Sequence, residues 1–300
     1  MKILLAGATS TLGQATLHEL VRRNHDVVPM TRSAESAARL RARGLEPVVA
    51  DVLDQPSVAA AVAECRPDAV VSLLIKLPRN GPTRYRDYRE SRRLWDVGVP
   101  NLLAAAQAAG TTRIVGESVV FAYGYCDHGV TPLSEDATLV PGATAAQREV
   151  LDSLRGMEEA IRGAGGVVLR YGLFRGSDVP SEGYLAKLMR MRLPMLPGGG
   201  QAVHSFVDLR DAARATADAV ERGTPGSTYN ICDDRPAEFA TYARVVAEER
   251  ELPAPRSAPL ALSRLAMPYT AFILSQVRIP MSNERARQDL GWRPSAPPLG

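Results

Sequence analysis

The chain has 300 residues, 45% of them apolar, which is enough for one large domain or for a core with a modest second region. Its net charge of +3 at pH 7 is too small to predict binding to nucleic acid or to a membrane surface. The three cysteines, Cys65, Cys126 and Cys232, are odd in number and far apart, which favours reduced thiols in the cytoplasm and argues against a metal site. No apolar run could span a bilayer, and the run in residues 1–10 ends in a glycine turn, as expected for a strand rather than for a signal peptide.

The first 170 residues alternate between strand-like and helix-like segments. Apolar runs of strand length occupy residues 2–6, 26–30, 47–50, 69–75, 113–121 and 166–171. Helical segments lie between most of them, at residues 11–23, 34–43, 56–65, 89–109 and 145–163. This alternation predicts an α/β fold, a doubly wound parallel sheet of the Rossmann type with helices on both faces. Its ligands should bind beyond the carboxyl ends of the strands, where the strand order reverses.

The alternation loosens after about residue 170. The expected elements are a short helix and glycine turn in 184–200, a strand and helix in 205–221 with Asp211 as the N-cap, a strand in 227–234 and a helix in 236–250. The apolar stretch 259–280 fits one or two helices interrupted by Pro268, and it is either part of the core or a lid over an apolar substrate. We expect a nucleotide-binding core formed by 1–169 and 205–235, and a smaller C-terminal substrate-binding region formed by 170–204 and 236–300.

The strongest local motif is "KILLAGATSTLGQATLHEL" in residues 2–20, in which a strand enters a glycine-containing turn that opens a helix. Such a turn presents free N–H groups and the positive end of a helix dipole to a pyrophosphate. Gly7 allows the tight turn and Gly13 allows close packing of helix and strand, whereas Ser10 replaces the middle glycine and can donate a hydrogen bond to phosphate. The residues expected to contact the cofactor here are Gly7, Thr9, Ser10, Thr11, Leu12 and Gly13.

The end of the second strand indicates which nucleotide is bound. An NAD site places a carboxylate there, but Asp26 lies at the strand's start and the end carries Arg32 and Ser33. These two side chains suit a 2′-phosphate, so we expect NADP(H) as the cofactor. Asp51 and Val52 follow the third strand, where an adenine edge can be recognised; for Asp51 a helix cap is an equal alternative. Further contacts are expected from Leu73, Leu74 and Lys76 after the fourth strand, and from Tyr171, which should line the nicotinamide.

Several motifs in one order resemble the extended short-chain dehydrogenase/reductase superfamily, in its epimerase/dehydratase branch. They are "GATSTLG", "SVVFAYG", "PLSEDATLVPG", "LRYGLFRG", "LPGGG", "SFVDLRDAA" and "SNERARQDLGW", and together they span nearly the whole chain. The resemblance implies a Ser or Thr where Val119 stands, and a Tyr-x-x-x-Lys pair where Leu151 and Arg155 stand. In that family the tyrosine donates a proton, which Leu151 cannot do, whereas Arg155 can still reach the ribose. Catalytic residues therefore stay unassigned, with Ser118, Lys76 and Tyr123 as weak candidates, although Ser118 should face the opposite side of its strand from Val119.

The resemblance also implies polar anchors for a sugar nucleotide, and they are replaced here. The position of the family's asparagine holds Leu173, and that of its arginine holds His204. An apolar substrate is the better expectation. The residues expected to bind it are Val119, Leu151, Leu173, Phe174, Met191 and His204.

Three functions fit these features. The first is an NADPH-dependent ketoreductase of an apolar, aromatic polycyclic metabolite of the polyketide type, whose own phenol supplies the proton. The second is a catalytically retired protein that senses NADP(H) and regulates a partner. The third is a non-redox cyclase or isomerase on the same fold. The apolar substrate residues favour the first, and the missing tyrosine favours the other two.

Overall fold

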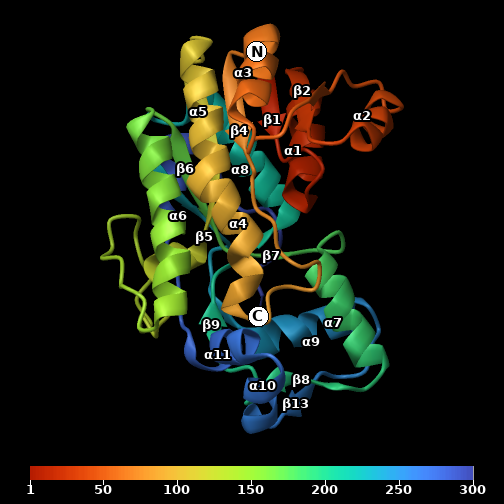
Figure 1. The fold of residues 1–300 in the computed structure, drawn as a ribbon. Coiled ribbons are helices and arrows are strands. Elements are labelled where there is room, and N and C mark those ends of the chain that lie inside the picture. Colours follow the sequence, from red (N-terminus) through yellow and green to blue (C-terminus); the bar gives the residue numbers. More distant parts are fainter. Residues whose placement is uncertain (300) are drawn as a thin grey trace.

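The computed structural model describes residues 1–299, and its centre is a parallel sheet of seven strands (Figure 1). In chain order these are β1 (Lys2–Ala6), β2 (Asp26–Thr31), β3 (Val48–Val49), β4 (Ala69–Ser72), β5 (Arg113–Val119), β6 (Val167–Tyr171) and β11 (Thr228–Ile231). In space they run β11-β6-β5-β4-β1-β2-β3, and every neighbouring pair is parallel. The order reverses between β1 and β4, so the predicted doubly wound sheet is confirmed. Sheets of this kind bind their ligands at the point of reversal.

Helices cover both faces of the sheet, because its strands carry buried apolar side chains on both faces. On one face α1 (Thr11–Arg22) packs beside α8 (Leu209–Arg222), and both bury leucines and alanines against β1, β4, β5 and β6. The other face is covered by α3 (Gln55–Cys65), α5 (Val99–Ala108) and α6 (Ala145–Gly163). The short helix α2 (Ala34–Arg41) follows β2.

The predicted helix 89–109 is interrupted. It consists of α4 (Arg89–Arg93), a turn of π-helix η2 (Leu94–Gly98) and α5. Pro100 stands in the first turn of α5 and has no N–H to donate to a carbonyl of the preceding turn, which explains the wider turn before it. Gly98 lies on that turn, where an added Cβ would come within 2.8 Å of the Val52 side chain.

The N-cap of α8 differs from the expectation. Asp208, not Asp211, caps this helix, and its carboxylate accepts from the Arg210 N–H at 2.8 Å. Asp211 lies inside the first turn and is buried, where it accepts hydrogen bonds from Ser295 and from the Ala296 N–H. The prediction was wrong because the hydrogen-bond donors of the C-terminal segment 293–297, which bind the Asp211 carboxylate, are distant in sequence from α8.

The remaining elements lie mostly below the sheet in Figure 1, but the last helix of the chain packs against α8 and β11. They are β7 (Leu173–Arg175), α7 (Pro180–Arg190), β8 (Pro194–Pro197), β9 (Val203–His204), β10 (Phe206–Asp208), β12 (Ala237–Glu238), α9 (Phe239–Glu249), β13 (Arg256–Ala258), α10 (Leu260–Ala266), α11 (Pro268–Gln276) and α12 (Glu284–Leu290). The short strands pair as β10-β7, β12-β9 and β13-β8. A separate apolar cluster in these elements includes Leu185, Met189, Phe206 and Tyr242.

The candidate lid, residues 259–280, divides at Pro268 into α10 and α11 as its sequence suggested. Tyr269 of α11 is buried and its N–H donates to the Thr83 carbonyl, while the Thr270 hydroxyl donates to the Pro82 carbonyl. These contacts place α11 in the core, whereas Leu265 of α10 is 80% exposed. Only α10 therefore stays a candidate lid. Among the described residues, no helix combines the length and apolar character needed to cross a membrane.

Candidate functional site: a nucleotide cleft without the expected proton donor

The turn after β1 is built for close approach of a backbone to a ligand. Gly7 has φ +84°, and a Cβ there would lie 2.1 Å from the Leu73 carbonyl oxygen. A Cβ on Gly13 would lie 2.1 Å from the Gly7 carbonyl oxygen. Only glycine fits either position, so the turn between β1 and α1 lies directly against the segment that follows β4. Both segments carry residues that the sequence predicts to contact the cofactor.

Ser10 sets the start of α1 at this turn. Its Oγ accepts from the Gly13 N–H at 2.9 Å, which makes it the N-cap, and its own hydroxyl proton stays free to donate. The first turn of α1 contains no acidic residue, so the positive end of its dipole is not neutralised. The cradle of Gly7, Ser10 and Gly13 thus fits the pyrophosphate of a dinucleotide. Thr9 is exposed beside it.

The residues expected to distinguish NADP(H) from NAD(H) follow the neighbouring strands β2 and β3. Arg32 is exposed after β2 and makes no ion pair within residues 1–299, and Ser33 accepts from the Ser36 N–H as the N-cap of α2. The carboxylate of Asp51 accepts from the Leu53 N–H, and Asp54 is the residue at the N-cap of α3. The helix-cap interpretation of Asp51 was therefore wrong, and contact with the adenine stays a prediction.

The residue at the family's proton-donor position lies in the core. Leu151 has no exposed surface and packs with Val150 and Leu154 of α6 against β5 and its neighbours. Val119, at the family's serine position, is partly exposed at the end of β5. Neither side chain can donate a proton.

Ser118 is buried on the α6 side of β5, and it is not free for catalysis. Its hydroxyl donates to Glu158 Oε1 at 2.6 Å, and the same carboxylate binds Arg170 at 2.6 and 2.8 Å. Arg170 lowers the pKa of Glu158 against the effect of burial, so the pair is ionised. This buried ion pair holds β5 and β6 to α6, and it removes Ser118 from the candidate acids.

Tyr123 is also structural. It is fully buried, and its hydroxyl lies 2.8 Å from Asn230 Oδ1 and 3.0 Å from the Ser134 carbonyl. Burial raises the pKa of Tyr123 to about 12, and the Arg170 guanidinium lies 4.8 Å from the centre of its ring. Lys76 differs, because its side chain is exposed while Ser91 fixes its backbone through two hydrogen bonds. Of the three weak candidates, only Lys76 keeps an accessible side chain.

Arg155 occupies the family's lysine position but makes different contacts. Its guanidinium donates to the Ala122 carbonyl at 2.9 and 3.0 Å and to the Val140 carbonyl at 2.7 Å. Burial lowers the pKa of Arg155. The side chain thereby fastens α6 to the 3-10 turn η3 (Val120–Tyr123) that follows β5. Contact of Arg155 with the ribose, expected from the resemblance, stays a prediction.

The expectation for Tyr171 needs correction, whereas a substrate contact of Met191 stays a prediction. Tyr171 is 1% exposed, and its hydroxyl lies 2.8 Å from the Thr216 hydroxyl of α8, so it points into the core and not toward a nicotinamide. Met191 is 57% exposed at the end of α7. Leu173 packs at the rim where the main core meets the C-terminal cluster, whereas Phe174 packs on Tyr171 with ring centres 5.5 Å apart. These two neighbours on β7 therefore face opposite sides, and Leu173 fits the predicted substrate role better.

His204 is buried, and its two ring nitrogens differ. Nε2 lies 3.1 Å from the Ile273 carbonyl and must donate to it, while Nδ1 has no partner. Burial lowers the pKa of His204 to about 4, so the ring is neutral near pH 7. Its edge approaches Phe121, with ring centres 6.4 Å apart. A neutral imidazole in this place cannot replace the charge of the family's arginine.

Sequence reasoning missed an aromatic cluster at the junction of core and C-terminal region. Its members come from three separate segments and are Tyr85, Tyr88, Phe121, Tyr125 and Tyr269. The ring centres of the pairs that pack together are 5.0–6.4 Å apart. The hydroxyls of Tyr88 and Tyr269 are 2.8 Å apart, while that of Tyr125 has no hydrogen-bond partner. The tyrosines in 78–95 and the aromatic residues after β5 were visible in the sequence, but nothing local indicated that they meet.

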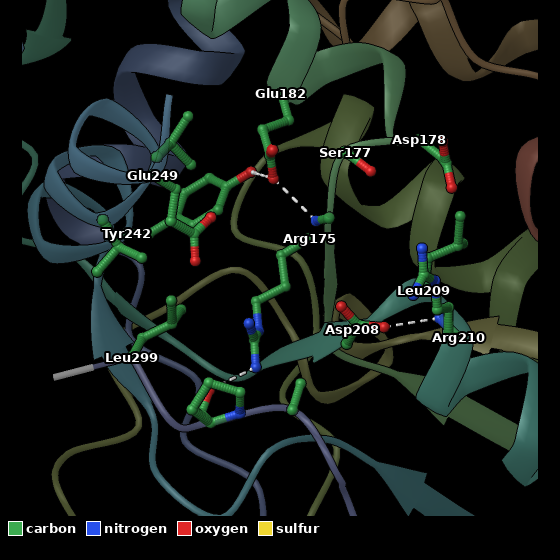
Figure 2. Close-up of a pocket in the computed structure, with 15 residues that line it drawn as sticks. Arg175, Ser177, Asp178, Glu182, Asp208, Leu209, Arg210, Tyr242, Glu249 and Leu299 are labelled. Carbon is green, nitrogen blue, oxygen red and sulfur yellow. Dashed lines mark hydrogen bonds between the residues drawn. The ribbon is translucent and has the colours of Figure 1, made fainter. Parts of the chain in front are cut away.

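A separate cavity of about 290 Å³ lies between α7, α9 and the C-terminal segment (Figure 2). Arg175, Asp208, Tyr242 and Leu299 are among its lining residues. Glu182 lies at its edge, where it accepts from the Gly176 N–H at 2.8 Å and from the Tyr242 hydroxyl at 3.0 Å. None of the residues predicted to bind cofactor or substrate lines this cavity, so it is distinct from the nucleotide cleft.

The fold and the glycine cradle define a dinucleotide-binding protein, and comparison with known proteins gives the same answer. Residues 7–165 match the family model described as NAD(P)H-binding, which covers more than half of the chain. The chain belongs to this family, and it is an atypical short-chain dehydrogenase/reductase and an NAD(P)H-dependent oxidoreductase. The expectations of a retired sensor and of a non-redox cyclase are therefore not supported.

Two curated relatives align over nearly their whole length. The chain is 35% identical to the 3-diazoavenalumate denitrifying reductase of a Streptomyces species, over 99% of this chain and 97% of that protein. It is 24% identical to the 4-hydroxy-2-methyl-3-oxo-4-farnesyl-3,4-dihydroquinoline-1-oxide ketoreductase of Stigmatella aurantiaca, over 97% and 92% of the two chains. Among solved structures, the Thermus thermophilus UDP-glucose 4-epimerase in complex with NAD superposes with a TM-score of 0.80 at 21% identity, covering 100% of this chain and 96% of that one. That similarity establishes the fold.

Proposed function

We propose that this protein transfers a hydride from NADPH to an aromatic substrate whose reduction needs no proton from the α6 helix. The observation that carries the proposal is the fully buried Leu151 at the family's donor position. The other candidate donors in the "SVVFAYG" motif are the hydroxyls of Ser118 and Tyr123, and both form hydrogen bonds within the protein. The exposed Arg32 after β2 supports NADPH over NADH through its fit to a 2′-phosphate. When bound, the cofactor supplies the hydride.

An arenediazonium ion is the acceptor class that fits this site best. Hydride addition to its terminal nitrogen gives an aryldiazene, which breaks its carbon–nitrogen bond, releases N2 and keeps the added hydrogen as a new C–H bond. The positive charge of the diazonium group is cancelled by the hydride, so the overall conversion takes up no proton. A protein without a donor residue is sufficient for this chemistry, and the name of the 35% identical relative, a denitrifying reductase of a diazo compound, supports the same class.

An aromatic ketone with a neighbouring phenol is the second candidate, as the sequence suggested, and the name of the ketoreductase relative supports it. The hydride forms a C–H bond at the carbonyl carbon while the phenol proton moves to the carbonyl oxygen, leaving a phenolate that solvent reprotonates. The phenol is already hydrogen-bonded to the carbonyl before hydride arrives, so little reorganisation accompanies the developing charge.

The test is NADPH oxidation by the purified protein with each acceptor. A hydroxynaphthalene diazonium salt should be reduced with release of equal amounts of N2 and NADP+. A hydroxyaryl ketone that is reduced while its methyl ether is not would favour the second candidate. Failure of both acceptors to oxidise NADPH would contradict the proposal.

A further inference from the structure

Tyr85 is the one member of the aromatic cluster that keeps part of its surface exposed. It begins the 3-10 turn η1 (Tyr85–Tyr88), on the segment that leads away from β4 and the cofactor cleft. The edges of Tyr125 and Tyr269 hold its ring on two sides, at 5.4 and 5.0 Å between ring centres. The position of the ring is thereby fixed by packing.

The side-chain amide of Gln147 fixes the role of the Tyr85 hydroxyl. Gln147 belongs to the capping box at the start of α6, and its Oε1 accepts from the Ala143 N–H at 2.8 Å and the Thr144 N–H at 3.2 Å. Because those backbone groups are donors, the amide orientation is determined, and Nε2 must point the other way. It donates to the Tyr85 hydroxyl oxygen at 3.0 Å.

A hydroxyl that accepts from an NH2 group cannot donate back to it. The proton of Tyr85 therefore has to be directed elsewhere, and residues 1–299 offer no acceptor for it. Tyr88, three residues on, differs because its hydroxyl is buried and paired with that of Tyr269. Tyr85 is thus an oriented hydrogen-bond donor whose proton is not used within the protein.

This donor lies close to the place where the family keeps its catalytic tyrosine. Gln147 stands four residues before Leu151 on α6, so the two side chains share a face of the helix at an axial separation of about 6 Å. Leu74 and Val119, at the ends of β4 and β5, pack against the same core cluster as Tyr85. The hydroxyl is therefore beside the reaction site but displaced by one helical turn from the missing donor.

We propose that Tyr85 donates a hydrogen bond to an oxygen acceptor on the aromatic substrate and so selects substrates that carry one. This inference deepens the proposed function and rests on it for the nature of the ligand. The acceptor is the ring oxygen of a hydroxyarenediazonium ion, which has carbonyl character once the phenol ionises, or the carbonyl oxygen of an aryl ketone. The phenolate left after reduction of the ionised diazonium compound regains from solvent the proton that it lost on ionisation. Gln147 is the positioning residue that keeps the Tyr85 proton available.

The test is calorimetric binding of acetylnaphthalene and ethylnaphthalene to the NADP+ complex. These probes have the same ring, and only the first has an oxygen acceptor. The wild-type protein should bind acetylnaphthalene about three- to tenfold more tightly, the range expected for one neutral hydrogen bond. Tyr85→Phe should abolish the preference, whereas the control Tyr88→Phe should retain it. Gln147→Glu should also abolish it, because a carboxylate still caps α6 but accepts the Tyr85 proton itself.

Equal affinity for the two probes in the wild-type protein, or measurable affinity for neither, would overturn the inference. So would a Gln147→Glu variant that keeps the preference, or a Tyr85→Phe variant that loses NADP+ affinity. The proposed reaction is judged separately by NADPH oxidation. If the binding pattern holds while neither a diazonium ion nor a ketone is reduced, the Tyr85 subsite stands and the reaction assignment fails. If either compound is reduced but the binding pattern is absent, the reaction assignment stands and the Tyr85 subsite fails.

Discussion

Glu117 is a buried carboxyl group on β5 without a charged partner, and replacing it should stabilise the protein. It is 6% exposed, and its Oε2 atom has no hydrogen bond. Burial raises its pKa from 4.5 to about 8, so the folded protein holds this proton near pH 7 while the unfolded chain does not. The contribution of this proton to the free energy of unfolding is fully present only below about pH 4.5, and it is lost as the pH rises toward 8. At pH 7 the buried carboxyl group lowers the free energy of unfolding by about 3 kcal/mol. The pH then lies about 2.5 units above the pKa of the group in the unfolded chain, and each unit corresponds to about 1.36 kcal/mol.

Glu117→Gln keeps the shape of the protonated acid and removes its titration. We expect the variant to match the wild-type free energy of unfolding near pH 4.5 and to exceed it by up to about 3 kcal/mol at pH 7. Urea denaturation, followed by the fluorescence of the buried Trp95 and Trp292, measures this difference. The matched control is Glu158→Gln, which leaves the buried Arg170 unpaired and should lose about 3–5 kcal/mol. A difference between wild type and Glu117→Gln that does not grow with pH would refute this reasoning.

Three further substitutions test the cofactor cleft and the helix that flanks it. Arg32→Ala should remove most of the preference for NADP(H) over NAD(H) in calorimetry, and equal affinity for both in the wild type would contradict the assignment. Gly13→Ala should weaken NADPH binding at least tenfold, because its Cβ would lie 2.1 Å from the Gly7 carbonyl oxygen; unchanged affinity would show that the turn can move. The double variant Leu151→Tyr, Arg155→Lys should not raise turnover, since position 151 lies in the core, and a large gain would show that a protein donor had been the missing part.

The sequence predicted the sheet and most of the helices because their signals are periodic and local. Apolar runs separated by amphipathic segments set the parallel sheet, and the glycines of the first turn need φ and space that no other residue tolerates. Alternation along β5 predicts that Ser118 and Val119 face opposite sides of the sheet. The same rule does not say which face of the sheet meets which helix, so it did not reveal that Ser118 meets Glu158 or that Tyr171 meets α8.

What the sequence could not provide depends on contacts between distant segments. The hydrogen bond between Tyr85 and Gln147 spans 62 positions, and that between Tyr88 and Tyr269 spans 181. Asp211 was a plausible cap until the C-terminal segment supplied its donors. Arg155 likewise reached backbone carbonyls exposed by the fold of η3. In each case the partner of the side chain is determined by tertiary packing.

The central claim is hydride transfer from NADPH to an aromatic acceptor without an acid from the protein. The most direct measurement is the single-turnover rate of NADPH oxidation by a hydroxynaphthalene diazonium salt, with protiated or C4-deuterated NADPH, in H2O and in D2O. The account predicts a slower rate with the deuterated cofactor and the same rate in both solvents, because no proton moves with the hydride. No oxidation of NADPH, or a rate that responds only to D2O, would contradict it.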